Sequence, residues 1–164
     1  MDPSSHPISQ GLHGGRPATA PAPQREGALA DPGSDDDFVS LLSAYRVSGG
    51  LVRAWEVVSM LEACGGPSVA LLARWIVERS VISVEWQGQT WLPWFQFKRL
   101  DRLPDPVLRA VLAEWAGVCD DGASAHWFAR ANALLAGRTP IDVLGDDPDA
   151  VLMAARADRF AIEG

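Results

Sequence analysis

The stretch Pro67–Leu92, PSVALLARWIVERSVISVEWQGQTWL, decides the fold because it passes from a helical to a strand period without a linker. A helix is predicted over about 68–79, since apolar residues recur there at helical spacing. The residues expected to face inward are Val69, Leu72, Ile76 and Trp75. Residues 81–86 are then rich in β-branched and aromatic side chains, and Gln87-Gly88 offers a turn. Residues 89–92 are expected to form a second strand that runs back along the first. The sequence therefore predicts a helix followed directly by a β-hairpin.

Two further helices are predicted upstream. Residues 51–63 are expected to be helical and to end at Gly65-Gly66, so that Pro67 takes the first position of the next helix. The inward face is expected to be Leu51, Val58 and Leu61, with either Ala54 or Trp55. An earlier short helix, ending at Gly49-Gly50, would bury Phe38, Leu41, Leu42 and Tyr45. Two helices joined by a short turn form a candidate helix-turn-helix, and the hairpin completes the outline of a winged helix.

The chain after the hairpin is predicted to be helical. The aromatic segment Trp91–Phe97 is expected to be mostly buried, and residues 98–104 form a polar linker. Three later helices are predicted to start at a capping residue followed by proline, namely Asp105-Pro106, Thr139-Pro140 and Asp147-Pro148. Another helix is predicted over 124–136, ending at Gly137. The expected inward faces of the three long helices are Val107, Leu108, Val111, Leu112 and Trp115; Trp127, Phe128, Ala131, Leu134 and Leu135; and Val151, Leu152 and Ala155, with Phe160 as a further candidate.

Composition limits the classes of protein that this chain can represent. The 164 residues are 48% hydrophobic and carry a net charge of −7, which fits a packed domain rather than a wholly disordered chain. Residues 1–37 are the exception, because they are rich in proline and glycine and show no apolar period, and we expect a disordered tail. No secretory signal or membrane-spanning stretch is recognisable. Two distant cysteines, Cys64 and Cys119, suit free thiols in a reducing cytosol, so a cytoplasmic location is expected.

Residues that suggest catalysis or metal binding have simpler interpretations. Ser124 and His126 stand two apart on a predicted helix and therefore on different faces, and no nucleophile elbow precedes the serine. The acidic run 146–149 lacks the alternating ligands of a calcium loop and suits helix capping. The glycine pairs lack the lysine of a phosphate-binding loop. We therefore expect neither an enzyme nor a bound cofactor or metal ion.

Nucleic-acid binding, if present, is expected in the middle of the chain. Residues 67–102 carry five basic residues against three acidic ones, whereas the flanking regions are acidic or neutral. The candidate DNA-binding residues are Arg74, Arg79, Lys98 and Arg99, with Arg74 and Arg79 placed on the outer side of the 68–79 helix. The first turns of that helix are apolar, so contacts to phosphate and DNA shape would dominate over base reading.

The C-terminal half resembles a known family. The run Asn132-x-x-Leu-x-Gly137-x-Thr139-Pro140-x-Asp142-x-Leu144, preceded by Ala125–Phe128 with Trp127 and followed by Val151 and Ala154-Ala155, is similar to the toxin-binding domain of Xre/MbcA/ParS-type antitoxins. The upstream segment Trp91–Phe97 is similar to the Pro-x-Phe-Gln-Phe segment that often precedes that domain. The resemblance covers about residues 50–162. The physics agrees, since Gly137 ends one helix, Thr139-Pro140 starts another, and Asn132 can hydrogen-bond across the junction.

The resemblance implies an antitoxin of a type II toxin–antitoxin module. Partners of such antitoxins are toxins of the RES-domain class that consume NAD, and the antitoxin covers the toxin's NAD pocket with its C-terminal helical domain. The resemblance also implies a homodimer and binding to promoter DNA. The expected organisation is a mainly α protein, with a tail over 1–37, a helix-turn-helix segment with hairpin over 38–102, and a toxin-binding domain over 103–164. Carried onto this chain, the toxin-facing residues are Arg156, Arg159, Phe160 and Ile162. The alternative is a DNA-binding regulator without a toxin partner.

Overall fold

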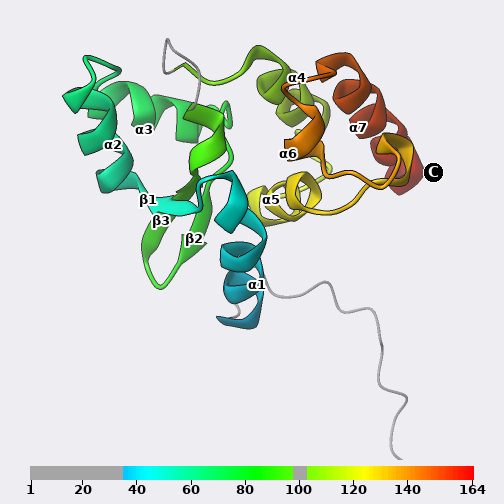
Figure 1. Ribbon diagram of the computed structural model, residues 1–164, viewed down its shortest axis with the longest axis horizontal. Helices are drawn as coiled ribbons and strands as arrows, with labels where there is room; N and C mark the ends of the chain where they lie inside the picture. Colours follow the sequence, from blue (N-terminus) through cyan, green and yellow to red (C-terminus); the bar gives the residue numbers. More distant parts are fainter. Residues whose placement is uncertain (1–34, 98–102) are drawn as a thin grey trace, which may run out of the picture.

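The computed structural model describes residues 35–97 and 103–164, which form seven α-helices and a small three-stranded antiparallel sheet (Figure 1). The elements in chain order are α1 (Asp35–Tyr45), the 3₁₀ helix η1 (Arg46–Ser48), β1 (Leu51–Arg53), α2 (Ala54–Ala63), α3 (Val69–Val77), β2 (Val84–Trp86), β3 (Gln89–Pro93), η2 (Trp94–Phe97), α4 (Pro106–Glu114), α5 (Asp121–Ala129), η3 (Ala133–Leu135), α6 (Pro140–Val143) and α7 (Pro148–Glu163). Helices α2 and α3 lie at one end of the molecule, and α4, α6 and α7 lie at the other. None of the described helices is long and apolar enough to cross a bilayer.

The predicted hairpin is confirmed, and a third strand joins it. The strand order is β1-β3-β2, with β3 paired antiparallel on both sides. Gln87 and Gly88 have φ angles of 48° and 69°, so both lie in the left-handed region that a tight two-residue hairpin requires. The third strand, β1, pairs Leu51 with Pro93 and Arg53 with Trp91.

The start of the predicted 51–63 helix was wrong. Its first three residues form β1, and α2 begins only at Ala54 because pairing with β3 holds the preceding backbone extended. The buried face of α2 is accordingly Val57 and Leu61, whereas Trp55 stays 59% exposed. Helix α3 begins after an N-cap at Ser68, so Pro67 precedes the helix rather than opening it.

The predicted disordered tail over 1–37 ends earlier than the sequence predicted. Helix α1 begins at Asp35, and its first turn holds three carboxylates, Asp35, Asp36 and Asp37, where the helix dipole favours negative charge. The rest of the predicted tail, residues 1–34, lies outside the described residues, as do residues 98–102 of the linker.

Helix α5 ends at Ala129 rather than at Ala136, because Arg130 is extended and Asn132 caps the separate turn η3. Leu134 is therefore 61% exposed instead of buried.

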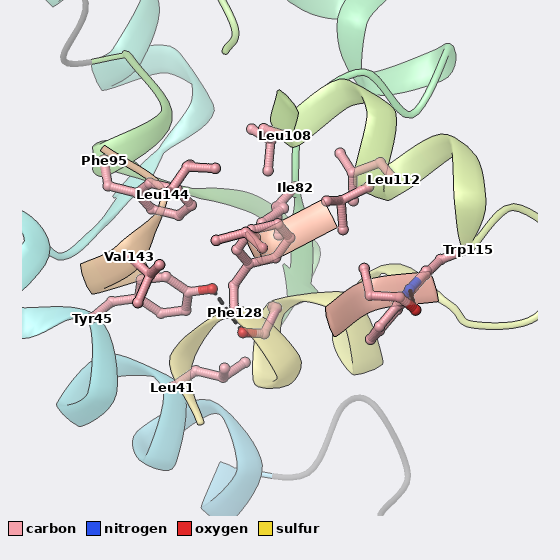
Figure 2. Close-up of a cluster of buried hydrophobic side chains, with 14 of the residues drawn as sticks. Leu41, Tyr45, Ile82, Phe95, Leu108, Leu112, Trp115, Phe128, Val143 and Leu144 are labelled. Atoms are coloured by element: carbon pink, nitrogen blue, oxygen red, sulfur yellow. Dashed lines mark hydrogen bonds between the residues drawn. The ribbon is translucent and has the colours of Figure 1, made fainter. Parts of the chain in front are cut away.

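The main hydrophobic core is shared by both halves of the chain. It joins buried residues of α1, the sheet and η2 to those of α4, α5, α6 and α7, and Figure 2 shows ten of them labelled: Leu41, Tyr45, Ile82, Phe95, Leu108, Leu112, Trp115, Phe128, Val143 and Leu144. The Tyr45 hydroxyl donates to the Ala125 carbonyl of α5 at 2.7 Å (Figure 2), and burial raises the pKa of Tyr45 far above its usual range. A smaller second cluster lies between α2, α3 and β3.

Candidate functional site

The family-like run between α5 and α7 folds into a tight corner. The backbone N–H of Asn132 donates to the backbone carbonyl of Arg138 at 3.0 Å, and the backbone N–H of Gly137 donates to the backbone carbonyl of Asn132 at 2.9 Å. Ala136 and Gly137 both have left-handed φ angles, of 56° and 77°. The expected junction is therefore present, with Asn132 at its centre and Gly137 at its turn.

The corner is attached to α7 through one carboxylate. Asp158 Oδ2 accepts hydrogen bonds from Trp127 Nε1 and from Asn132 Nδ2, both at 2.7 Å. Asn132 Oδ1 meanwhile accepts from the Leu134 amide at 2.8 Å, so both ends of this side chain are used. The hydrogen bond of Asn132 across the Gly137–Thr139 junction is made by its backbone N–H to Arg138, whereas its side chain bonds Asp158 of α7, which was not predicted.

The short helix α6 starts as predicted, with one difference in its cap. Thr139 is the N-cap, Pro140 takes the first position, and Thr139 Oγ1 accepts from the Asp142 amide at 3.2 Å. The Asp142 carboxylate accepts from the threonine hydroxyl at 2.6 Å, not from the backbone N–H that the capping-box pattern predicts. The motif residues therefore have structural roles in placing α6 and α7.

The last turns of α7 expose large apolar side chains. Phe160 is 79% exposed and Ile162 is 59% exposed, so the expectation that Phe160 faces inward was wrong. Met153, two helical turns before Phe160 and on the same face, is 62% exposed. The opposite face of α7 buries Val151, Ala154 and Ala155 against the main core, together with other residues.

The two arginines of α7 are held by an acidic residue of α4. Arg156 Nε lies 2.8 Å from Glu114 Oε1, and Arg159 Nη1 lies 3.2 Å from Glu114 Oε2. Arg159 also pairs with Glu163 one turn later, at 3.2 Å. The hydrogen bond from Arg156 is the main reason that the pKa of Glu114 lies below its usual value, with Arg159 adding to the effect. These cations are thus partly neutralised within the molecule.

The four candidate DNA-binding residues do not form one described surface. Arg74 is on the outer side of α3, with its side chain 71% exposed, and it pairs with Glu78 at 2.7 Å. Arg79 lies beyond the end of α3, with a φ of 51°, and its guanidinium contacts Asp121 at 2.7 Å and the Cys119 carbonyl at 2.9 Å. The placement of Arg79 on the outer side of the helix was therefore wrong. Lys98 and Arg99 lie outside the described residues.

The serine and histidine considered for hydrolysis have separate partners. Ser124 Oγ is buried in α5 and donates to the Asp120 carbonyl at 2.9 Å. His126 Nε2 lies 3.2 Å from Asp37 Oδ1 of α1. Within residues 35–97 and 103–164, no cluster of three or more histidine, cysteine or acidic side chains could hold a metal ion.

Sequence reasoning missed Glu114 and Asp158, whose contacts fix the position of α7 and of its exposed end. Both partnerships join residues at least 26 positions apart, and residue spacing carries no signal for such pairs. Comparison with protein-family models, with curated proteins and with solved structures finds no match to this chain.

Proposed function

We propose that this chain is an antitoxin-like protein of a type II toxin–antitoxin module, which binds a RES-class, NAD-consuming toxin and covers its active site without chemistry of its own. The observation that carries the proposal is the exposed apolar face of α7 formed by Met153 and Phe160, with Ile162 also exposed on the last turn but on another side of the helix. Contiguous exposed apolar surfaces mark protein-binding sites, and aromatic residues are frequent anchors in such interfaces.

The fixation of α7 supports this use of its end. Glu114 of α4 pairs with two arginines of α7. Asp158 of α7 accepts hydrogen bonds from Trp127 of α5 and from Asn132 in the corner. A surface that is already ordered loses little conformational entropy when it binds, so more of the contact energy appears as affinity. In this proposal, the run that resembles the antitoxin family fixes the position of α7, the helix that binds the toxin.

Phe160 and Ile162 are expected to contribute more to toxin binding than Arg156 and Arg159. Both arginines already have carboxylate partners within the chain, so they offer a partner protein little uncompensated charge. We infer that the toxin presents an apolar surface beside its pocket, and that the affinity changes little with salt.

We further infer that the first half of the chain is winged-helix-like. The support is the element order α1-β1-α2-α3-β2-β3 together with the sheet order β1-β3-β2, in which the early strand closes the hairpin. In that arrangement α3 takes the place of the recognition helix and the β2–β3 hairpin takes the place of the wing.

The second candidate function, a DNA-binding regulator without a toxin, rests on this topology and on the excess of basic over acidic residues in 67–102. The charges of α3 and the hairpin weigh against it, because α3 carries one arginine, paired with Glu78, and the hairpin segment Val84–Pro93 carries Glu85 as its one charged residue. A salt-titrated binding assay with promoter fragments tests it. Affinity that rises steeply as salt falls would support this function, and no affinity at low salt would reject it.

Phe160→Glu tests the antitoxin proposal. Mixed with a purified RES-class toxin, the unmodified chain is expected to form a complex and to stop NAD consumption. The variant is expected to bind at least about 30-fold more weakly, because it removes an aromatic anchor and places a charge in the interface. The matched control is Val47→Glu, which adds the same charge at a 93% exposed valine on η1.

Two results would contradict the proposal. One is a chain that forms no complex with RES-class toxins and leaves NAD consumption unchanged. The other is a complex that Phe160→Glu and Val47→Glu weaken equally, because the end of α7 would then not be the contact. Circular dichroism of both variants shows whether the fold is retained.

A further inference from the structure

A shallow groove lies beside β1 and α2, at the end of the molecule opposite α7 (Figure 1). Its volume is about 470 Å³, and its exposed apolar side chains are Trp55, 59% exposed, and Met60, 44% exposed. Both lie off the buried face of α2, so the core does not need them. The other residues that line the groove are Leu51, Val52, Glu56 and Ser59.

The groove suits an occupant that is both proline-rich and basic. Proline rings pack well on exposed aromatic side chains, and proline-rich segments lose little conformational entropy when they bind. Helix α2 carries two carboxylates, Glu56 and Glu62, and no basic residue. Ser59 and Glu62 follow Trp55 at helical spacing, so one of these carboxylates lies on the same side of the helix as the indole.

The chain itself contains a segment of this chemistry. Residues 16–25 read RPATAPAPQR, with prolines at 17, 21 and 23, an arginine at each end and no acidic residue. Arg16 and Arg25 are the only lysine or arginine residues among the 34 residues that precede α1. A segment with two positive charges is complementary to an acidic helix.

The charges around the exposed aromatic rings favour Trp55 as the contact. Within residues 35–97 and 103–164, two aromatic side chains are strongly exposed, Trp55 and Phe160. Phe160 lies one turn after Arg156 and next to Arg159, and the carboxylates near these arginines are already paired with them. The end of α7 therefore offers an arginine-bearing segment little attraction, whereas the carboxylates of α2 have no such competitors on their own helix.

We propose that residues 16–25 dock in the groove beside β1 and α2 of the same chain, with the stretch Pro21–Pro23 against the Trp55 indole and the flanking arginines attracted by the carboxylates of α2. Docking within one chain needs no high protein concentration, because a short connection gives an effective concentration in the millimolar range. A proline-rich segment of another protein would have to displace residues 16–25 before it could use the groove.

The connection between the segment and α1 is long enough. The Asp35 carboxylate, at the start of α1, accepts from Trp86 Nε1 at 3.0 Å, so α1 begins beside the end of β2. From β2 to β1 the sheet is two strand spacings wide, about 10 Å, and α2 follows β1 directly. Residues 26–34 can span about 30 Å when extended, which exceeds the width of the sheet.

This inference goes beyond toxin binding and uses a different surface, so it is tested without toxin. In the full chain, Trp55→p-benzoylphenylalanine keeps an aromatic ring in the groove, and irradiation links that ring to whatever it touches. Peptide mass spectrometry is expected to find links to residues 16–25, in a product with the 17.6 kDa mass of one copy. Val47→p-benzoylphenylalanine, at a 93% exposed position on η1, is the matched control and is expected to give no such link.

Two pairs of proline substitutions separate docking from chance contact. Pro21→Gly with Pro23→Gly is expected to lower the yield of the link at least about tenfold, because glycine removes the rings and adds conformational freedom that docking must restrict. Pro3→Gly with Pro7→Gly makes the same change outside the segment and is expected to leave the yield unchanged. Glu62→Lys is expected to lower the yield as well, since it replaces attraction of the arginines by repulsion.

Several outcomes would overturn the proposal: links from position 55 to other parts of the chain instead, a product of twice the mass, equal yields from positions 55 and 47, or equal losses from the two proline pairs. A product of twice the mass would place the segment of a second copy in the groove. Phe160→Glu is expected to leave the link intact, so failure of docking and failure of toxin binding are distinguishable.

Discussion

At the residue scale, Asp158 determines how the C-terminal half fits together. One of its carboxylate oxygens accepts from Trp127 on α5 and from Asn132 in the corner. The sequence predicted the importance of the two donors but not their acceptor, because Asp158 lies on another helix and no periodicity links the three residues. Pairs of this kind depend on how the helices pack.

Asp158→Ala is expected to lower the free energy of unfolding by about 2 kcal/mol, because it leaves two partly buried donors without their acceptor. Urea unfolding measures the change. Glu62→Ala, which removes an exposed carboxylate from α2, is the control and is expected to stay within about 0.5 kcal/mol of the unmodified chain. Equal losses in the two variants would show that Asp158 does not hold the corner.

At the element scale, the helix starts marked by a capping residue and a proline were the most predictable feature. Asp105, Thr139 and Asp147 are all N-caps followed by proline, because capping depends on residues two or three positions apart. Strand β1 was not predictable in the same way. Its three residues fit a helical pattern, and only pairing with β3, about 40 residues later, holds them extended.

The contact between α4 and α7 predicts a pH effect. The pKa of Glu114 lies below its usual value of 4.5, so its ion pairs with Arg156 and Arg159 stabilise the fold above that pH. The contribution is lost as pH falls from there through the lowered pKa. Glu114→Gln should therefore melt at a lower temperature than the unmodified chain at pH 7, and the difference should shrink in acid.

Melting curves recorded from neutral to acidic pH check this expectation. Glu62→Gln, on the exposed side of α2, provides the comparison for removal of one negative charge. A melting difference for Glu114→Gln that stays constant across the range would contradict the role of the ion pairs, since a carboxylate that titrates must lose them.

At the scale of the whole molecule, sequence analysis predicted helix content and the hairpin better than it predicted surfaces. Which side of a helix stays exposed depends on how many neighbours pack against it. Phe160 was a candidate both for the inward face of its helix and for toxin contact, and it is exposed; Val69 was expected to face inward and faces outward. The end of α7 was named as toxin-facing from the family resemblance alone, and the exposure of its apolar side chains became visible only once the helices were placed.

The shared core predicts that the described chain unfolds as one unit. Tyr45 of α1 and Phe128 of α5 belong to the same buried cluster, so a fragment of residues 103–164 would expose the surface that α1 and the sheet cover. We expect one urea transition, with tryptophan fluorescence and far-ultraviolet circular dichroism giving the same midpoint. The isolated fragment is expected to lack a cooperative transition. Two separate transitions in the full chain, or a fragment that unfolds cooperatively at the midpoint of the full chain, would show that residues 103–164 form an independent domain.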